Sequence, residues 1–582
     1  MNLKSLINKL KYPTKEKMEQ LKGNIKLRDT FPIIGLDPLS RFLILPDSVS
    51  RAAVLTITPT IEVGSVITDA LNEFYSTIPY KALNDGSWII QEYLYTEEIN
   101  GIRYSKCKLF IYRKVQSKDL KDDTYDASTE LEEHIHSLER SLDEIGVPYY
   151  FDSFLEILEW YSMFSEGGKQ NLDLDEESIF DEISNSVFST NLRPSSSENC
   201  FKSDHNNFYR FLRFSGIRKL PSNGQWSSSI SFKERSYPRY INAIENMGIN
   251  NIVVRMMAFS KPESGEDKIL SSSGVYLRET SLEQVNIEQR NVTSLMARHG
   301  INILKDNHDG LSLNSFLIHL PLVLNAEQDE KGNYLRPMYL THGAQLSLIH
   351  GSSTGYVKEA DVDMITDSGY RLSLKLESKK SIVLAKDVGS FNNENICYDT
   401  LIQSGKYNSY LKDTEANIAL LTEKITTMDV GVALSDLLGT HVLSGELEYI
   451  YDSNSPVSFL ATLYHYLNEK CLRDNANGQK TKNKIVVDTH LWSNELLGRH
   501  INGVLASLLR NSHQCILFLS QCTSELVNLT DYVFIEGKFD KPFKCFSDVQ
   551  PLIDCVSNER GALLIDNKVF FYKITNKELN RA

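Results

Sequence analysis

The amino-acid sequence predicts a multidomain protein in which an N-terminal α+β part is followed by a C-terminal α/β part with a mainly parallel sheet. The chain has 582 residues and is 41% hydrophobic, which is enough for two to four domains that each bury a core. Its first part holds strand-like blocks joined by tight turns. From about residue 340 onward, short apolar strands alternate with helical patterns, as in parallel sheets with crossover helices.

The first elements are expected to be two strands within residues 40–60. This stretch is apolar and β-branched, and its Pro46-Asp47-Ser48 segment is typical of a turn. A helix is expected over 69–75. A further strand pair is expected across 87–114, with Asn100-Gly101 at the turn, because this dipeptide tolerates the positive φ angles of a hairpin turn.

An acidic amphipathic helix is predicted within residues 117–145. Its apolar residues recur at helical spacing, at Leu131, Ile135, Leu138 and Leu142. His134 and His136 are two positions apart and therefore lie on different faces of that helix, which argues against a metal site.

Composition shifts divide the remaining chain. Residues 166–207 are rich in Gly, Asp, Glu, Ser and Asn, which favours a flexible linker or insertion. The predicted organisation is an N-terminal α+β domain (1–165), this linker (166–207), a middle α+β domain (208–335) and a C-terminal domain (336–582) with a mainly parallel sheet. The middle domain is expected to contain strands at 209–216, 226–232 and 251–259 and a helix at 277–298, and the last domain strands at 382–385, 425–429, 485–488 and 515–521.

Charge and cysteine usage narrow the function classes. The net charge of -14 opposes binding to phosphate backbones, so protein partners rank above nucleic acid. The eight cysteines are dispersed with no CxxC pair, which argues against a zinc site or disulfide framework and indicates a reducing compartment. Lysines interrupt the apolar stretches of the N-terminus, so neither a signal peptide nor a membrane span is expected there.

Six blocks of the sequence, in order, resemble those of the TraC-type ATPases of conjugative type IV secretion. They are RFLILPDSVSRAAVLTITPT, HGINILKDNHDGLSLNSFLIHLPLVLN, MYLTHGAQLSLIHG, SGYRLSLKLESKKSIVLAKDVGS, TTMDVGVALSDLLGTHVLSGELEYIYD, and the pair KIVVDTHLWS and LLRNSHQCILFLSQ. The resemblance covers most of the chain. It implies that residues 336–582 form a degenerate RecA-like P-loop NTPase domain.

The motif that binds phosphate in such domains is missing. A phosphate loop needs GxxxxGK[ST], whose backbone N–H groups wrap the phosphates while Lys and a hydroxyl reach the nucleotide and Mg²⁺. No segment of the chain matches it. Where the resemblance places the loop, Ala385 is followed by Lys386, Asp387, Val388, Gly389 and Ser390, and the aspartate puts negative charge where phosphate would lie.

The resemblance also assigns the remaining positions of a degenerate nucleotide site. Asp488 corresponds to the magnesium-binding aspartate, but Thr489 follows it where a hydrolytic relative has glutamate, and threonine cannot act as the carboxylate base. Asp488 is alternatively a strand-end residue that caps the next turn. Gln521 corresponds to the γ-phosphate sensor or is simply a polar strand terminus, and Asp429 to the aspartate of the second strand. Arg499 and Arg510 are candidate interface arginines, with surface salt bridges as the alternative.

The sequence therefore predicts no catalytic residue, no metal and no cofactor. The implied function is a non-hydrolysing TraC-like component of a conjugative or type IV secretion apparatus. Its implied partners are inner-membrane secretion proteins, an active ATPase paralogue or further copies of itself, in the cytoplasm at the inner membrane. Two alternatives stay open: an active ATPase with an atypical loop around Lys386 and Ser390 that uses ATP and Mg²⁺, and a structural protein of a mobile element or phage.

Overall fold

The computed structural model divides the chain into two compact units, which are described separately. Unit 1 comprises residues 1–99 and 103–355, and unit 2 comprises 100–102 and 356–582. The structure describes residues 31–37, 39–59, 65–78, 88–115, 119–121, 126–144, 147–164, 172, 180–188, 191–195, 200–217, 250–259, 268–298, 301–304, 312–324, 335–349, 362–374, 379–385, 417–421, 483–488, 503, 505–506, 509–510, 514–519, 522–537, 544–546, 553–557, 560–565 and 568–573.

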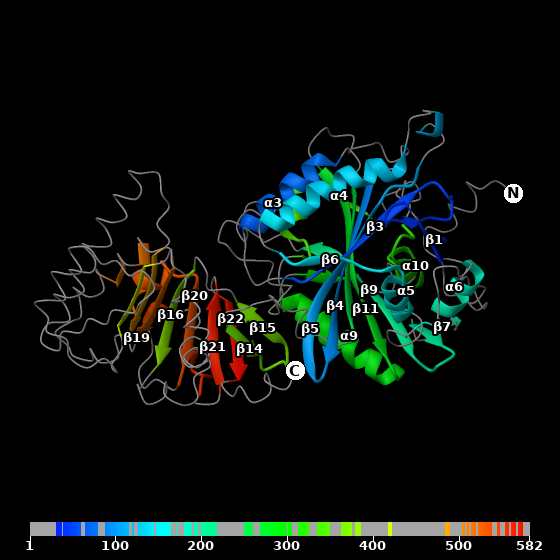
Figure 1. Cartoon of the computed structure of the whole chain (residues 1–582). Helices are drawn as coiled ribbons and strands as arrows, with labels where there is room; N and C mark the ends of the chain where they lie inside the picture. The colour runs from blue at the N-terminus through cyan, green and yellow to red at the C-terminus, as the bar shows by residue number, and fades with distance from the viewer. Residues whose placement is uncertain are drawn as a thin grey trace, which may run out of the picture. The chain divides into compact units, whose positions relative to one another are not determined.

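Unit 1 is built on one thirteen-stranded sheet with the order β1-β2-β3-β5-β4-β10-β11-β9-β8-β7 (Figure 1). Three further strands pair alongside this path, β6 with β3, β12 with β9 and β13 with β11. The strands are β1 (Gly35–Leu36), β2 (Leu43–Ile44), β3 (Arg51–Ile57), β4 (Trp88–Ile99), β5 (Ile102–Tyr112), β6 (Tyr149–Phe151), β7 (Leu192–Ser195), β8 (Cys200–Ser203), β9 (Phe208–Ile217), β10 (Ile252–Phe259), β11 (Lys268–Glu279), β12 (Ile301–Ile303) and β13 (Arg336–Tyr339). Pairings such as β10 with β4 and β11 with β9 are antiparallel.

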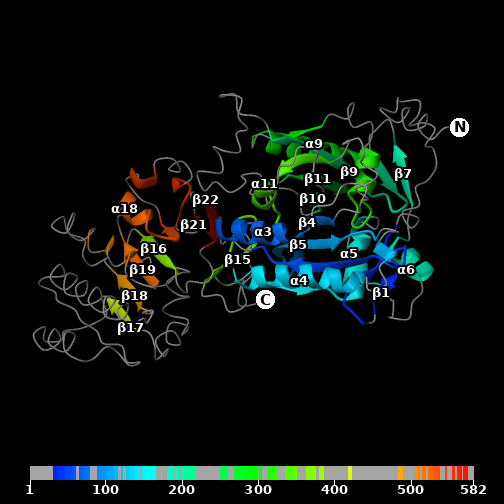
Figure 2. The same ribbon diagram turned by 90° about the horizontal axis from the view of Figure 1, so that it is seen from above.

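Two apolar cores cover the two faces of this sheet. Along β4, Trp88, Ile90 and Leu94 belong to one core, while Ile89 and Tyr93 belong to the other. This alternation follows from the two-residue repeat of a strand. The first core receives α3 (Ser65–Thr77), α4 (Ala127–Glu144), α9 (Leu282–Arg298) and α11 (Leu340–Gln345), and the second receives α5 (Phe154–Tyr161), α6 (Phe180–Val187) and α10 (Ser312–Ile318). Figure 2 shows α3 and α4 side by side.

Several expectations for the first part of the chain are confirmed. The turn between β2 and β3 includes Ser48 with a φ of 64°, and Asn100 and Gly101 join β4 to β5 with φ angles of 54° and 79°. Positive φ at both central residues is the geometry that an Asn-Gly hairpin turn favours. In α4 the predicted residues Leu131, Ile135, Leu138 and Leu142 are buried.

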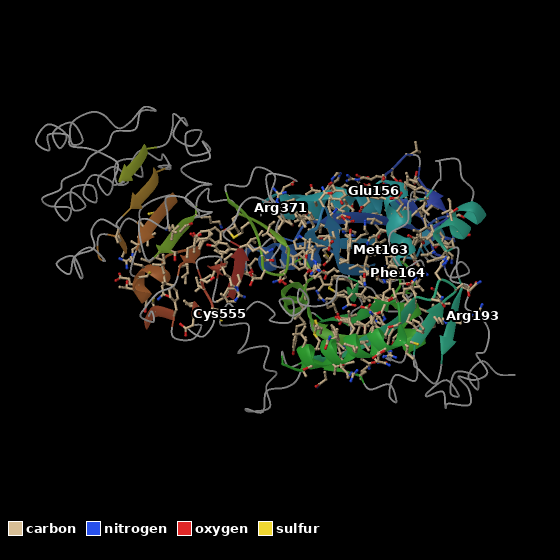
Figure 3. All side chains as sticks on the ribbon, turned by 90° about the horizontal axis from the view of Figure 1, so that it is seen from below. Glu156, Met163, Phe164, Arg193, Arg371 and Cys555 are labelled. Atoms are coloured by element: carbon tan, nitrogen blue, oxygen red, sulfur yellow. The ribbon has the colours of Figure 1, made fainter. Side chains whose placement is uncertain are left out.

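Other boundaries differ from the expectation. Ser281 accepts a hydrogen bond from the backbone N–H of Gln284 and caps α9, so the helix begins at Leu282, and residues 277–279 belong to β11. Capping also fixes the start of α5, where Ser153 and Glu156 form a capping box (Figure 3 labels Glu156). The expected strand at 226–232 lies outside the described residues.

The single sheet joins regions that were expected to form separate domains. Strands from 1–165 and from 208–335 share it, and the segment 166–207, expected as a linker, contributes α6, β7 and β8. Its few apolar residues, such as Ile183, Leu192 and Phe201, are buried in the second core. The division between the units falls after Gly355, beyond the expected boundary at 336.

Unit 2 contains a seven-stranded sheet with the order β17-β18-β19-β16-β20-β21-β22. Its strands are β16 (Lys380–Ala385), β17 (Asn417–Leu421), β18 (Asn483–Asp488), β19 (Gln514–Leu519), β20 (Tyr532–Glu536), β21 (Arg560–Ile565) and β22 (Lys568–Lys573), and a hairpin of β14 (Val362–Ile365) and β15 (Arg371–Leu374) forms a second sheet. The four pairings from β17 to β20 are parallel, and β20-β21 and β21-β22 are antiparallel. The expected strands at 382–385 and 485–488 lie in β16 and β18, and the strand expected at 515–521 lies in β19 as far as Leu519. Residues 520–521 and 425–429 lie outside the described residues.

The two units together give the chain a mixed α/β content in which antiparallel pairings predominate. No helix within the described ranges is long and apolar enough to cross a membrane.

Candidate functional site

The candidate site lies at the carboxyl edge of the parallel strands of unit 2. Central strand β16 lies between β19 and β20, and its last residue, Ala385, pairs with Glu536 at the end of β20. On the other side Leu384 pairs with Leu519 at the end of β19. In open α/β sheets this edge is where ligands bind, because the loops that leave the strands there form a crevice.

Asp488 ends β18 at the same edge. Its backbone pairs with Phe518 of β19, and Phe518 in turn pairs with Val383 of β16. Asp488 is therefore level with Val383, two strand spacings away, which is a backbone distance of about 10 Å. The structure thus brings the residue predicted to bind magnesium to the same sheet edge as the start of the predicted loop.

Burial holds the central strand in place. Ile382, Val383 and Leu384 of β16 are fully buried, and Ile382 and Leu384 belong to a core that also contains Leu517 of β19 and Ile535 of β20. A central parallel strand has apolar side chains on both faces because helices and loops cover both. The edge therefore has a rigid support at β16.

Most of the residues that the sequence assigns to this site lie outside the described residues. They are Lys386, Gly389, Ser390, Asp429, Arg499 and Gln521. Of the two candidate interface arginines, Arg510 is described. It is exposed, and its Nη2 lies 2.8 Å from Oε1 of Glu525 in the same chain, which matches the alternative interpretation of a surface salt bridge.

A carboxyl group that the sequence analysis did not single out lies at the same edge. Glu536 is buried, and its Oε1 accepts a 2.7 Å hydrogen bond from the hydroxyl of Tyr572. Tyr572 lies in β22, two strands away, and its ring passes over Gly561 of the intervening β21, with which it pairs. This contact directs the Glu536 carboxyl toward β22, away from β18, so its role in the described structure is to join three strands.

No sequence signal could have found Glu536 as part of this edge. The relevant residues come from three strands that a linear pattern does not connect, and an acidic residue at the end of a strand is common in loops as well. Among the described residues, no group of three or more His, Cys, Asp or Glu side chains is arranged to hold a metal ion.

Comparison with known proteins gives partial structural likenesses. No family model and no curated protein sequence matches the chain. One similar solved structure is the genome packaging NTPase B204 from Sulfolobus turreted icosahedral virus 2 in complex with ATP-gammaS. The two sequences are 11% identical, and the match covers 34% of this chain and 98% of the B204 chain, with a TM-score of 0.24.

A second similar structure is EssC (ATPases 2 and 3) from Geobacillus thermodenitrificans. The two sequences are 11% identical, and the match covers 40% of this chain and 48% of the EssC chain, with a TM-score of 0.25. Both solved structures are therefore NTPases that resemble part of the chain. Identities and TM-scores of this size are too low to assign a fold or an activity to it.

Proposed function

We propose that this chain is a non-hydrolysing, TraC-like component of a conjugative or type IV secretion apparatus, in which unit 2 is a degenerate RecA-like nucleotide domain. The observation that carries the proposal is the contrast at the carboxyl edge of β16. The sheet keeps a central parallel strand with Asp488 at the same edge, while the residues after Ala385 lack the phosphate-binding motif.

The strand order supports a nucleotide-domain origin. From β16 the chain goes to the edge strand β17 and then returns through β18 and β19, and it passes β16 to reach β20. Parallel crossovers are almost always right-handed, so connections that run in opposite directions along the sheet leave on opposite faces. The reversal supports a topological switch point between β16 and β19, which is where a ligand would bind in such a sheet.

The chemistry at that point supports the loss of hydrolysis. A phosphate loop offers backbone N–H groups and a lysine to the phosphates, but here Asp387 brings a negative charge into the segment. Thr489 follows Asp488, and threonine cannot polarise the attacking water as a carboxylate does. Under this proposal the sheet serves as a scaffold for contacts with partners, although its catalytic loops have lost their function, because a fold can persist without its original activity.

The proposed partners follow from the same resemblance and from charge. Inner-membrane secretion proteins, an active ATPase paralogue or further copies of the chain would bind it, and the cytoplasmic side of the inner membrane is its proposed location. A net charge of -14 favours protein surfaces over nucleic acid as partners. Within unit 1, the proposed docking region is residues 1–165.

The test is binding and hydrolysis of a fluorescent ATP analogue with Mg²⁺ by the purified full chain. The wild-type protein is compared with Lys386→Ala and Asp488→Asn, of which the second removes charge and keeps shape. Lys380→Ala is the matched control, because Lys380 begins β16 at the opposite end from the candidate site, roughly 15 to 20 Å away along the strand.

We expect no turnover by any of the four proteins and no binding that depends on Lys386 or Asp488. Turnover by the wild type and the control, together with its loss in the other two variants, would replace the proposal with an active ATPase that has an atypical loop.

A further inference from the structure

Two cysteines of unit 2 that are separated in sequence lie against each other. Cys522 lies in the segment after β19, and Cys545 lies in a short 3₁₀ helix, η9 (Lys544–Phe546), 23 positions later. The Sγ of Cys545 donates to the carbonyl of Cys522 at 3.5 Å, and the Sγ of Cys522 donates to the carbonyl of Thr523 at 3.6 Å.

The surroundings of the pair are intermediate between core and solvent. Both cysteines are partly exposed, and both pack against the unit 2 core. By contrast, Cys515 and Cys107 are fully buried. An oxidant in solution can therefore reach Cys522 and Cys545.

The contact also differentiates the two thiols. The Cys522 side chain lowers the pKa of Cys545 by favouring its thiolate form. The pKa of Cys522 is raised, first by its interaction with the Cys545 side chain and then by burial. These directions favour Cys545 as the nucleophile of the pair.

We propose that Cys522 and Cys545 are an oxidative modification site, at which a hydroperoxide converts the two neighbouring thiols to an intramolecular disulfide. The Sγ of Cys545 already lies 3.5 Å from the backbone oxygen of Cys522, so the two side chains are neighbours that rotation can bring toward the S–S bond length of about 2.0 Å. In a reducing compartment such a disulfide is transient and reports oxidation.

The reaction balances with hydrogen peroxide as the oxidant. The Cys545 thiolate attacks one peroxide oxygen, an S–O bond forms, the O–O bond breaks, and hydroxide leaves and takes up a proton to give water. Cys522 then loses its proton, and its sulfur attacks the Cys545 sulfur. The S–S bond forms as the S–OH bond breaks, and the second hydroxide takes up that proton. Overall, two thiols lose two electrons to one peroxide, and two waters are released.

The disulfide would close a covalent loop around the strand next to the candidate site. The residues between the two cysteines include α18 (Ser524–Val527) and β20, whose end pairs with the end of β16. Oxidation would therefore tie the segment after β19 to the segment after β20 at the carboxyl edge of the sheet. This inference stands independently of nucleotide binding, because it uses residues that the proposed nucleotide site does not include.

The experiment treats the purified full-length wild type with increasing hydrogen peroxide, blocks remaining thiols by alkylation and maps disulfides by mass spectrometry of a non-reducing digest. We expect one dominant cross-linked peptide pair, containing Cys522 and Cys545, that disappears after treatment with dithiothreitol. Cys555, which is exposed (Figure 3), is the internal control and should stay outside that pair.

Two variants test the assigned roles. In Cys522→Ser, the sulfenic acid on Cys545 should accumulate and react with dimedone, whereas Cys545→Ser should give at least tenfold less adduct on Cys522. A dominant cross-link that includes Cys555, no cross-link before sulfinic acid forms, or stronger labelling of Cys522 than of Cys545 would overturn the proposal. The wild-type mapping decides the first two outcomes even if a variant fails to fold.

Discussion

Replacing Gly561 with alanine should open the end of the unit 2 sheet. A Cβ at Gly561 would lie 2.3 Å from Cζ of Tyr572 and 2.7 Å from its hydroxyl oxygen, distances that real side chains do not adopt. The Tyr572 ring is fully buried and would have to move, which would break its 2.7 Å hydrogen bond to Glu536. The substitution therefore acts on β20, β21 and β22 together.

The magnitude follows from two contributions. Overpacking in a well-packed site costs about 1–3 kcal/mol, and leaving the Glu536 carboxyl buried without its hydroxyl donor costs about 1–3 kcal/mol. We expect a loss of roughly 3 kcal/mol in local stability. Since every 1.4 kcal/mol is about a factor of ten, hydrogen exchange should be on the order of a hundredfold faster.

The assay is hydrogen exchange measured by mass spectrometry on peptides that cover 532–536 and 560–573, because it reports the local opening of these strands. Gly503→Ala is the matched control. Gly503 occupies an exposed helical position with open space around it, so the added methyl should change stability by at most about 1 kcal/mol and in the stabilising direction.

The cause is isolated by repeating Gly561→Ala in a Tyr572→Leu background. If the clash with the ring is responsible, the substitution should cost much less there than in the wild type. An equal cost in both backgrounds, or unchanged exchange after Gly561→Ala alone, would refute the reasoning.

Two further predictions concern buried charges. Burial lowers the pKa of His319 from 6.5 to about 3, so the native state takes up this proton less readily than the unfolded chain. The contribution of neutral His319 to the free energy of unfolding is complete above pH 6.5, and it falls by up to about 1.4 kcal/mol per pH unit as the pH drops toward 3. In urea unfolding at several pH values, His319→Gln should flatten this dependence. In unit 1, buried Glu92 accepts hydrogen bonds from Ser347 and the backbone of Leu348 and lies 3.5 Å from buried Arg255. Glu92→Gln should therefore lower the free energy of unfolding by about 3–5 kcal/mol in the same assay. Glu525→Gln, which breaks the exposed pair with Arg510, should lower it by at most about 1 kcal/mol. Comparable losses in the two variants would show that burial does not decide the difference.

Elements whose cause is local could be predicted from the amino-acid sequence. The spacing of Leu131, Ile135, Leu138 and Leu142 indicated α4 and its buried face, since a helix repeats every 3.6 residues. Asn100-Gly101 indicated the hairpin between β4 and β5, because the turn requires positive φ. The apolar runs at 382–385 and 485–488 indicated two strands that the structure contains.

Helix and segment boundaries were predicted less well, for a physical reason. Whether residues 277–279 continue a strand or begin a helix depends on the pairing of β11 with β9, and local propensity does not report such pairing. Likewise, the polar composition of 166–207 concealed the few apolar residues that unit 1 buries.

The contacts between distant segments became visible in the folded chain. The tertiary structure joined strands from 1–165 and 208–335 in one sheet, and it brought Asp488, Ala385 and Glu536 to one edge of another. It also placed the thiol of Cys545 against the backbone carbonyl of Cys522, although the sequence shows only dispersed cysteines. These contacts depend on strand order and register, which are set by the packing of whole sheets and leave no periodic signal in the chain.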